Sequence, residues 1–180
     1  MGYSISWLAI KGRAKPDIHR ELGLSESGKT EEEPESVILG TDLPDGSYLV
    51  FLNECFHRFI VSDEILGRLS QGCEIVGCQV EEHVMVSAAF GWKDGHRLWE
   101  VGHEADKGID NLDVEGAPPA ALREIEARLR ARQDKYDSEN DDVDAIFDIP
   151  VELAFACCGY RHDYGQFAWG RPVYAVLEEI

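Results

Sequence analysis

Residues 75–92 alternate between apolar and polar side chains with a period of two, and this regularity limits the fold more than any other feature of the chain. The even positions are mostly apolar, whereas the odd positions include the polar residues Gln79, Glu81, His83 and Ser87. Such alternation is typical of β-structure with one buried face. Because the phase does not change along the stretch, we expect one long bent strand, or two strands that keep the same phase. A tight hairpin at Glu81–Glu82 is disfavoured, because two-residue turns prefer Gly or Asn.

The dipeptide Asp94-Gly95 directly follows this stretch and is a strong signal for a two-residue hairpin loop. A loop there pairs Lys93 with His96, and the same register pairs Phe90 with Trp99, Val86 with His103 and His83 with Asp106. The predicted hairpin has a buried face formed by Val84, Val86, Phe90, Trp92, Trp99 and Val101. Its outer face is formed by Glu81, His83, Glu100, Glu104 and Asp106. We interpret His103, which lies among the apolar positions, as a hydrogen-bonded core residue.

Other segments complete the predicted fold. Residues 3–10 and 47–52 have the composition of strands, and residues 174–177 favour a strand. Helices are predicted over 16–22, 63–71, 118–136 and 149–158, from apolar stripes and capping signals. The acidic segment 25–36 is predicted to be a solvated loop. This order indicates an α+β fold, an antiparallel β-sheet with a long central hairpin, covered by helices on one face. With no repeat and no dividing linker, we predict a single domain over residues 1–180.

The chain is strongly acidic, with 35 Asp and Glu against 17 Lys and Arg and a formal net charge of -18. Such a charge repels nucleic-acid phosphates and anionic membrane surfaces, so we expect no direct binding to nucleic acid or to membranes. A basic protein is the favoured partner, although an acidic surface also serves solubility alone. No stretch approaches the roughly 18 consecutive apolar residues of a membrane span.

The five cysteines are an odd number and include no CxxC pair. This pattern indicates neither a disulfide framework nor a zinc site, so we expect a reducing compartment. The N-terminus has no basic stretch ahead of its short apolar run, which favours the cytoplasm. Phosphate-binding, dinucleotide-binding, zinc-protease and nucleophile-elbow motifs are all missing from the sequence, so we predict no cofactor.

The outer face of the predicted hairpin carries the candidate reactive residues. Glu81 and His83 share a face, and the predicted register brings Glu104 and Asp106 across from them. A histidine with two or three carboxylates can do acid–base chemistry, so these four are the candidate catalytic residues. The same set can bind a divalent metal, with His83 and Asp106 as candidate ligands. The alternative is a solvated polar face that carries no chemistry.

Four segments resemble a family of small bacterial proteins that are known only as uncharacterised. They are SISWLAIKG at 4–12, GCEIVGCQVEEHVM at 72–85, GWKDG at 91–95 and KGIDNLDVEG at 107–116. The resemblance runs through most of the chain and is weakest after Asp148. It implies a bacterial origin, and it carries over no activity, cofactor or catalytic residue.

Three hypotheses of function follow from these features. The leading one is a soluble acidic module that binds a basic protein, in the manner of an immunity protein or an inhibitor, because acidic surfaces speed encounter with basic partners. The rival is a metal-assisted or general acid–base enzyme built on the four candidate residues. The third is a homo-oligomer interface formed by the aromatic hairpin, with Trp92 and Trp99 partly exposed.

Overall fold

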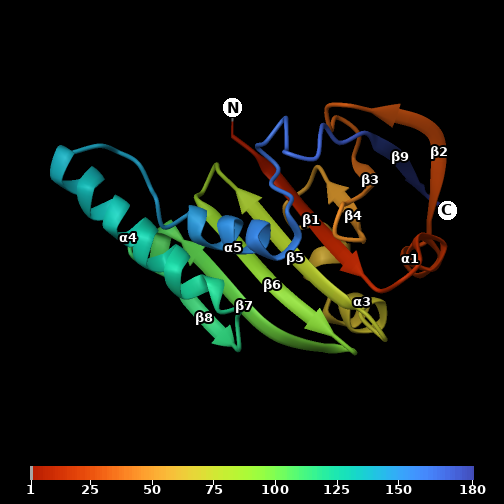
Figure 1. Cartoon of the computed structure of the whole chain (residues 1–180), viewed down its shortest axis with the longest axis horizontal. Helices are drawn as coiled ribbons and strands as arrows, with labels where there is room; N and C mark the ends of the chain where they lie inside the picture. Colours follow the sequence, from red (N-terminus) through yellow and green to blue (C-terminus); the bar gives the residue numbers. More distant parts are fainter. Residues whose placement is uncertain (1) are drawn as a thin grey trace.

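The computed structural model describes residues 2–180, which form an α+β fold built on a nine-stranded antiparallel sheet (Figure 1). The strands are β1 (Ser4–Lys11), β2 (Leu24–Glu31), β3 (Ile38–Asp42), β4 (Ser47–Leu52), β5 (Glu74–Glu81), β6 (Val86–Lys93), β7 (His96–Glu104), β8 (Asp113–Gly116) and β9 (Tyr174–Glu179). The helices are α1 (Lys15–Leu22), α2 (Arg58–Val61), α3 (Asp63–Leu69), α4 (Ala121–Glu139) and α5 (Asp148–Cys158), with a 3-10 turn, η1, at Ala105–Lys107. Across the sheet the order is β2-β9-β3-β4-β1-β5-β6-β7-β8.

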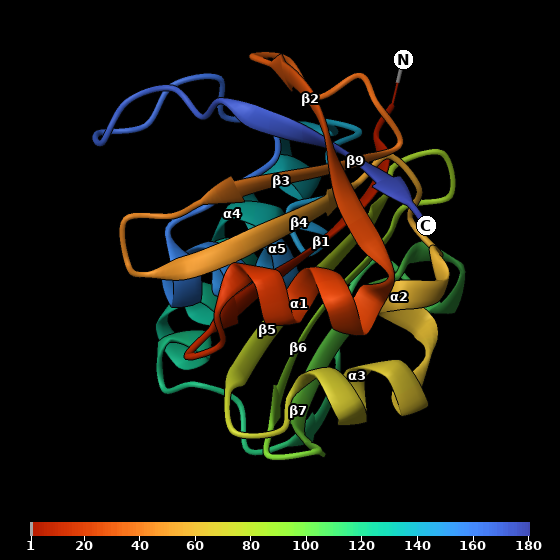
Figure 2. The same cartoon turned by 90° about the vertical axis from the view of Figure 1, so that its right-hand side faces the viewer.

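The sheet carries one hydrophobic core on each face. Odd residues of β1, such as Trp7, pack in a core with α4 and α5, whereas even residues, such as Leu8, pack in a second core with α1, α2 and α3. Figure 2 shows α1, α2 and α3 on the near side of the sheet, with α4 and α5 behind it. The predicted antiparallel α+β fold is therefore confirmed, but helices cover both faces rather than the one face that was predicted.

Local sequence signals explain the helix boundaries. The side chain of Ser62 accepts a hydrogen bond from the backbone N–H of Ile65 and so caps α3. Gly159 takes a left-handed conformation after α5, as glycines that end helices commonly do. None of the helices within residues 2–180 has the length and apolar character needed to cross a membrane.

Residues 75–92 form two strands joined by a hairpin, so the prediction of a constant phase is wrong. β5 ends at Glu81 and β6 begins at Val86. The turn contains no Gly, but Met85 takes a positive φ of 50° and allows the chain to reverse. Even residues of β5, such as Val80, consequently face the α4–α5 core, whereas Phe90 of β6 faces the opposite core. Val84 lies in the turn and is 53% exposed rather than buried.

The Asp94-Gly95 loop is confirmed, and Lys93 pairs with His96. Beyond the loop the register shifts, because Trp92 pairs with Arg97 whereas Gly91 pairs with Trp99. Leu98 is thus an additional residue in β7, a β-bulge that changes all the pairs predicted farther along the hairpin. The corrected pairs are Phe90 with Glu100, Ser87 with His103, and Val86 with Glu104.

The bulge also separates the two hairpin tryptophans. Trp92 belongs to the core under α3, and Trp99 belongs to the core under α4 and α5. They are 6% and 7% exposed, so the prediction that both lie partly at the surface is wrong. The aromatic hairpin therefore offers no tryptophan surface for a second copy of the chain.

The acidic segment predicted as a solvated loop contains β2, which pairs with β9 at one edge of the sheet. Its burial pattern shows only Leu24 buried. An edge strand exposed along most of its length has no apolar alternation, so the sequence carries no strand signal there.

Candidate functional site

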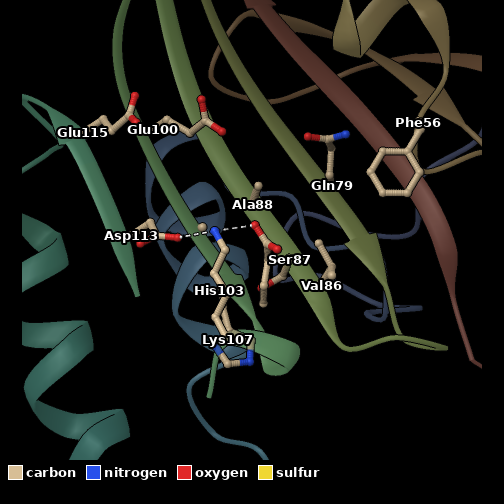
Figure 3. Close-up of a pocket in the computed structure, with 12 residues that line it drawn as sticks. Phe56, Gln79, Val86, Ser87, Ala88, Glu100, His103, Lys107, Asp113 and Glu115 are labelled. Carbon is tan, nitrogen blue, oxygen red and sulfur yellow. Dashed lines mark hydrogen bonds and ion pairs between the residues drawn. The ribbon is translucent and has the colours of Figure 1, made fainter. Parts of the chain in front are cut away.

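The face of β5–β8 that is turned away from α4 and α5 is open over part of its area. α2 and α3 cover only one end of this half of the sheet, where Phe90 and Trp92 lie. Beside them are two cavities of about 350 and 250 Å³, which share the lining residues Phe56, Gln79 and Glu100. We call the two together the acidic groove, which is lined mainly by Phe56, Gln79, Ala88, Arg97, Glu100, Gly102, Glu104, Lys107, Asp113 and Glu115. Figure 3 shows the cavity that is lined by Ala88, Lys107 and Asp113.

Small residues make the groove hollow. Ala88 of β6 and Gly102 of β7 are direct cross-strand partners, so no large side chain fills the centre of this face. Larger side chains flank them on the same face, because residues two apart on a strand point the same way. Glu100 and Glu104 lie on either side of Gly102 in β7, and Asp113 and Glu115 lie on the neighbouring β8.

The groove contains two pairs of carboxylates, each with one member on β7 and one on β8. One basic side chain lies between the members of each pair. The Lys107 Nζ lies 2.9 Å from a carboxylate oxygen of Glu104 and 2.9 Å from one of Asp113 (Figure 3). Arg97 forms an ion pair with Glu100 and lies 3.9 Å from an oxygen of Glu115. The carboxylates of the groove are therefore arranged to hold ammonium and guanidinium groups.

Glu100 is the most buried carboxylate of the groove and contacts both cavities. Burial raises its pKa above the usual value, the nearby Arg97 lowers it, and the carboxylate of Glu115 raises it further. Glu100 and Glu115 are direct cross-strand partners, which places two like charges opposite each other. Such a pair destabilises the sheet unless a cation lies between its members.

Phe56 is an exposed aromatic ring between the two cavities. It is 56% exposed, although two hydrogen bonds hold the backbone directly before it. The Ser6 Oγ donates a 2.7 Å hydrogen bond to the carbonyl oxygen of Glu54, and the Gln79 side-chain amide donates one of 3.1 Å to that of Cys55. The sheet thus presents an apolar ring on a fixed backbone to the groove.

The candidate catalytic residues are only partly brought together. The His83 Nδ1 lies 2.6 Å from the Glu81 Oε1, and the Ser4 Oγ donates a 2.5 Å hydrogen bond to the Glu81 Oε2. The hydrogen bond from Ser4 is the largest cause of a lowered pKa at Glu81. The carboxylate lies between the hydroxyl and the imidazole, so His83 is not placed to take a proton from Ser4.

The remaining two candidates lie on the other side of β6. Val86 pairs with Glu81 on one side and with Glu104 on the other, so a whole strand separates the two carboxylates. Glu104 binds Lys107 instead, and Asp106 lies in η1 with an exposed side chain. Within residues 2–180 no group of three or more His, Cys, Asp or Glu side chains is arranged to hold a metal ion. Acid–base chemistry at Glu81 and His83 stays a prediction.

Sequence reasoning missed a second histidine–carboxylate pair. His103 is fully buried, with its Nδ1 2.7 Å from the carbonyl oxygen of Asn111 and its Nε2 2.8 Å from a carboxylate oxygen of Asp144. Both neighbours only accept hydrogen bonds, so both ring nitrogens carry a proton and the imidazole is positively charged. Burial lowers the pKa of His103, but the bonds to Asp144 and Asn111 outweigh it and raise the pKa overall.

Ser87 is the cross-strand partner of His103, which gives a Ser, His and Asp set in one place. However, the Ser87 Oγ donates to the carbonyl oxygen of Phe147, 2.7 Å away, and not to the histidine. Neither imidazole nitrogen is free to accept a proton from it, and all three side chains are buried or nearly so. This set therefore ties β6 and β7 to the segment before α5, as expected for a hydrogen-bonded core histidine. No sequence signal linked His103 to Asp144, because 41 residues separate them.

The comparisons with known proteins add no relative to this description. No protein-family model matches the chain, and neither a curated protein nor a solved structure shows significant similarity to it.

Proposed function

We propose that this protein is a binding module whose acidic groove receives a basic segment of a partner protein, in the manner of an immunity protein or an inhibitor. The observation that carries the proposal is the combination, in one hollow, of an exposed aromatic ring next to a hydrogen-bonded backbone segment with paired carboxylates. Exposed aromatic anchors beside polar rims are common centres of protein interfaces.

The charge of the groove favours a cationic partner. Five acidic side chains line the two cavities, namely Asp63, Glu100, Glu104, Asp113 and Glu115, against the basic side chains Arg97, Lys107 and His103, and Asp144 balances the charge of His103. The net charge of -18 extends the same sign over the whole molecule. A field of this kind steers a basic protein toward the surface and increases its association rate.

The internal ion pairs do not block the groove. Arg97 and Lys107 are 41% and 51% exposed at their side chains, and exposed ion pairs contribute about 0–1 kcal/mol. Lysine or arginine side chains of a partner can therefore replace them at small cost. The two residues show which chemical groups the carboxylates accept.

The test uses a ten-residue peptide with lysine at every second position and threonine between, with calorimetry to measure its affinity. The double variant Glu100→Gln/Glu115→Gln should weaken binding about tenfold, which is the loss of about 1.4 kcal/mol. The matched control Glu124→Gln/Asp134→Asn removes the same charge from exposed positions of α4, on the opposite side of the sheet, and should change affinity far less.

Three outcomes would contradict the proposal. They are an equal loss in the control variant, binding that does not weaken as salt is raised, and equal binding of a peptide in which glutamate replaces lysine. The first would point to general attraction by the net charge rather than to the groove.

We also propose that the protein works in the cytoplasm. All five cysteines are free, and four of them are buried. Burial raises the pKa of Cys157, the fifth, to about 11, so its thiol is protonated and slow to oxidise at neutral pH.

A further inference from the structure

We infer that the partner binds by adding an extended strand to the free edge of β8, with lysine or arginine at alternating positions over the acidic groove. This inference rests on the proposed function and specifies how the partner docks. β8 is the last strand of the sheet, and its four residues are all exposed. A strand in this position offers unpaired backbone groups to an incoming chain.

The backbone of Val114 points away from the sheet. The backbone N–H of Ala117 donates a hydrogen bond to the carbonyl oxygen of Leu98, which lies directly opposite it on β7. Hydrogen-bonded and non-hydrogen-bonded pairs alternate in an antiparallel ladder, so the pair of Val114 with Val101 is non-hydrogen-bonded. The N–H and C=O of Val114 therefore point away from β7, toward the free edge of the sheet. In the described residues 2–180, no backbone group of a turn or loop forms a hydrogen bond with them. The Val114 side chain is 47% exposed as well.

The side chains of β8 match an extended cationic segment. Asp113 and Glu115 are two residues apart and both line the acidic groove. Alternate side chains of an added strand would lie beside them with the same spacing, about 6.6–6.8 Å. Lysine or arginine at those positions would meet one carboxylate each, which is favourable for cross-strand pairs.

The same charges argue against a second copy of the chain as occupant. Pairing of β8 with another β8 would bring Asp113 and Glu115 of both copies together on one face, and like charges placed opposite each other are destabilising. The other edge of the sheet is also less suitable. β2 has a register irregularity between Glu26 and Thr30, and Gly28 has a positive φ of 83° there, which disturbs a regular ladder.

The decisive measurement is hydrogen exchange of the Val114 amide, followed by NMR with and without the lysine–threonine peptide. The amide should exchange rapidly in the free protein, because its N–H faces solvent, and at least about tenfold more slowly when the peptide is saturating. The amide of Glu115, which faces β7, is the internal control and should be protected in both states. Unchanged exchange at Val114 in a saturated complex would overturn strand addition.

Two further reagents separate this inference from the proposed function. A peptide with N-methyl groups on its threonines keeps every charge but cannot pair along that edge, because a threonine would lie opposite Val114, and it should bind about tenfold more weakly. The variant Val114→Pro removes the outward N–H and should have the same effect, whereas Val114→Thr should not.

The outcomes are distinct. If the Glu100→Gln/Glu115→Gln variant loses affinity while the N-methylated peptide binds as well as the parent peptide, the groove proposal stands and strand addition is wrong. If the parent peptide does not bind at all, both fail. If Val114→Pro does not fold, the exchange measurement on the unaltered protein still decides.

Discussion

The two faces of β5–β8 have opposite characters, although the same four strands form both. The face under α4 and α5 is closed, and its polar groups are paired internally, as His103 is with Asp144. The other face is open above the small residues Ala88 and Gly102. The polar groups around this opening include carboxylates that form ion pairs with exposed basic side chains. One face therefore stabilises the fold, and the other carries the groove for which we propose a binding role. The buried pair of His103 and Asp144 thus belongs to the structure of the closed face, whereas acidic side chains beside small residues line the candidate site.

The largest expected difference in stability is between two variants that each remove one aromatic ring, one from the closed face and one from the open face. Trp99→Ala should lower the free energy of unfolding by about 3–5 kcal/mol, because it leaves a cavity in the closed core. Phe56→Ala should lower it by less than about 1 kcal/mol, because that ring is already half exposed. Urea denaturation measures both. Similar losses in the two variants would mean that the open face is part of the core.

Breaking the buried ion pair should have the next largest effect. Asp144→Ala leaves His103 without its carboxylate and removes the acceptor for the Phe147 N–H, so we expect a loss of about 3 kcal/mol. Asp142→Ala, two residues earlier and exposed, is the matched control and should stay within about 0.5 kcal/mol of the unaltered protein. Equal stability of the two variants would show that the pair contributes nothing.

A pH series tests the same pair without a large change in packing. His103 has a raised pKa in the folded protein, so its contribution to stability is complete below its unfolded pKa of about 6.5 and is lost as pH rises through the folded pKa. Asp144 has a lowered pKa, so its contribution is present above about pH 4 and is lost as pH falls. The stability advantage over His103→Gln should therefore be larger near pH 5.5 than near pH 9, by about 1.4 kcal/mol for each unit of the raised pKa.

An NMR titration of the histidines gives an independent check. Burial lowers the pKa of His162 to about 4, so at pH values between the two pKa values His162 should be neutral while His103 is charged. The two resonances should then shift at opposite ends of the titration. A pKa of His103 below that of His162 would contradict the charged pair.

The smallest expected effect on stability belongs to the open face. Glu100→Gln should change the free energy of unfolding by no more than about 0.5 kcal/mol, because it weakens the ion pair with Arg97 but also relieves repulsion from Glu115. A loss above about 2 kcal/mol in thermal or urea denaturation would show that the groove carboxylates hold the fold together. Their role in binding would then need a different explanation.

Much of the fold could be predicted from local signals. α4, α5, the cap at Ser62 and the Asp94-Gly95 loop all depend on residues close together in the sequence, and all are confirmed. The turn at residues 82–85 and the bulge at Leu98 could not be predicted, because neither contains the Gly or Asn that marks most turns. The turn and the bulge each change which face of the sheet the following side chains occupy. Missing them therefore assigned many residues of β6 and β7 to the wrong face.

The candidate site was harder to predict than the fold. The sequence placed Glu81, Glu100 and Glu104 on one outer face, and the strand pairings confirm this. It could not reveal the hollow between them, which depends on Ala88 and Gly102 meeting across two strands. Phe56 carries no signal of exposure in sequence, since its place is set by contacts of Ser6 and Gln79 with the neighbouring carbonyl groups.

The bulge at Leu98 decides which residues of β7 lie in the core beneath α5. If Leu98 instead paired with Gly91 as an ordinary ladder residue, Trp99 would pair with Phe90, and every side chain from Trp99 to Glu104 would change to the opposite face of the sheet. The indole of Trp99 and the imidazole of His103 would then leave the core, while the carboxylates of Glu100 and Glu104 would be forced among its apolar side chains. Deleting Leu98 removes this competing register and keeps Gly91 opposite Trp99, so a chain shortened by this one residue should keep both faces of β7 as they are.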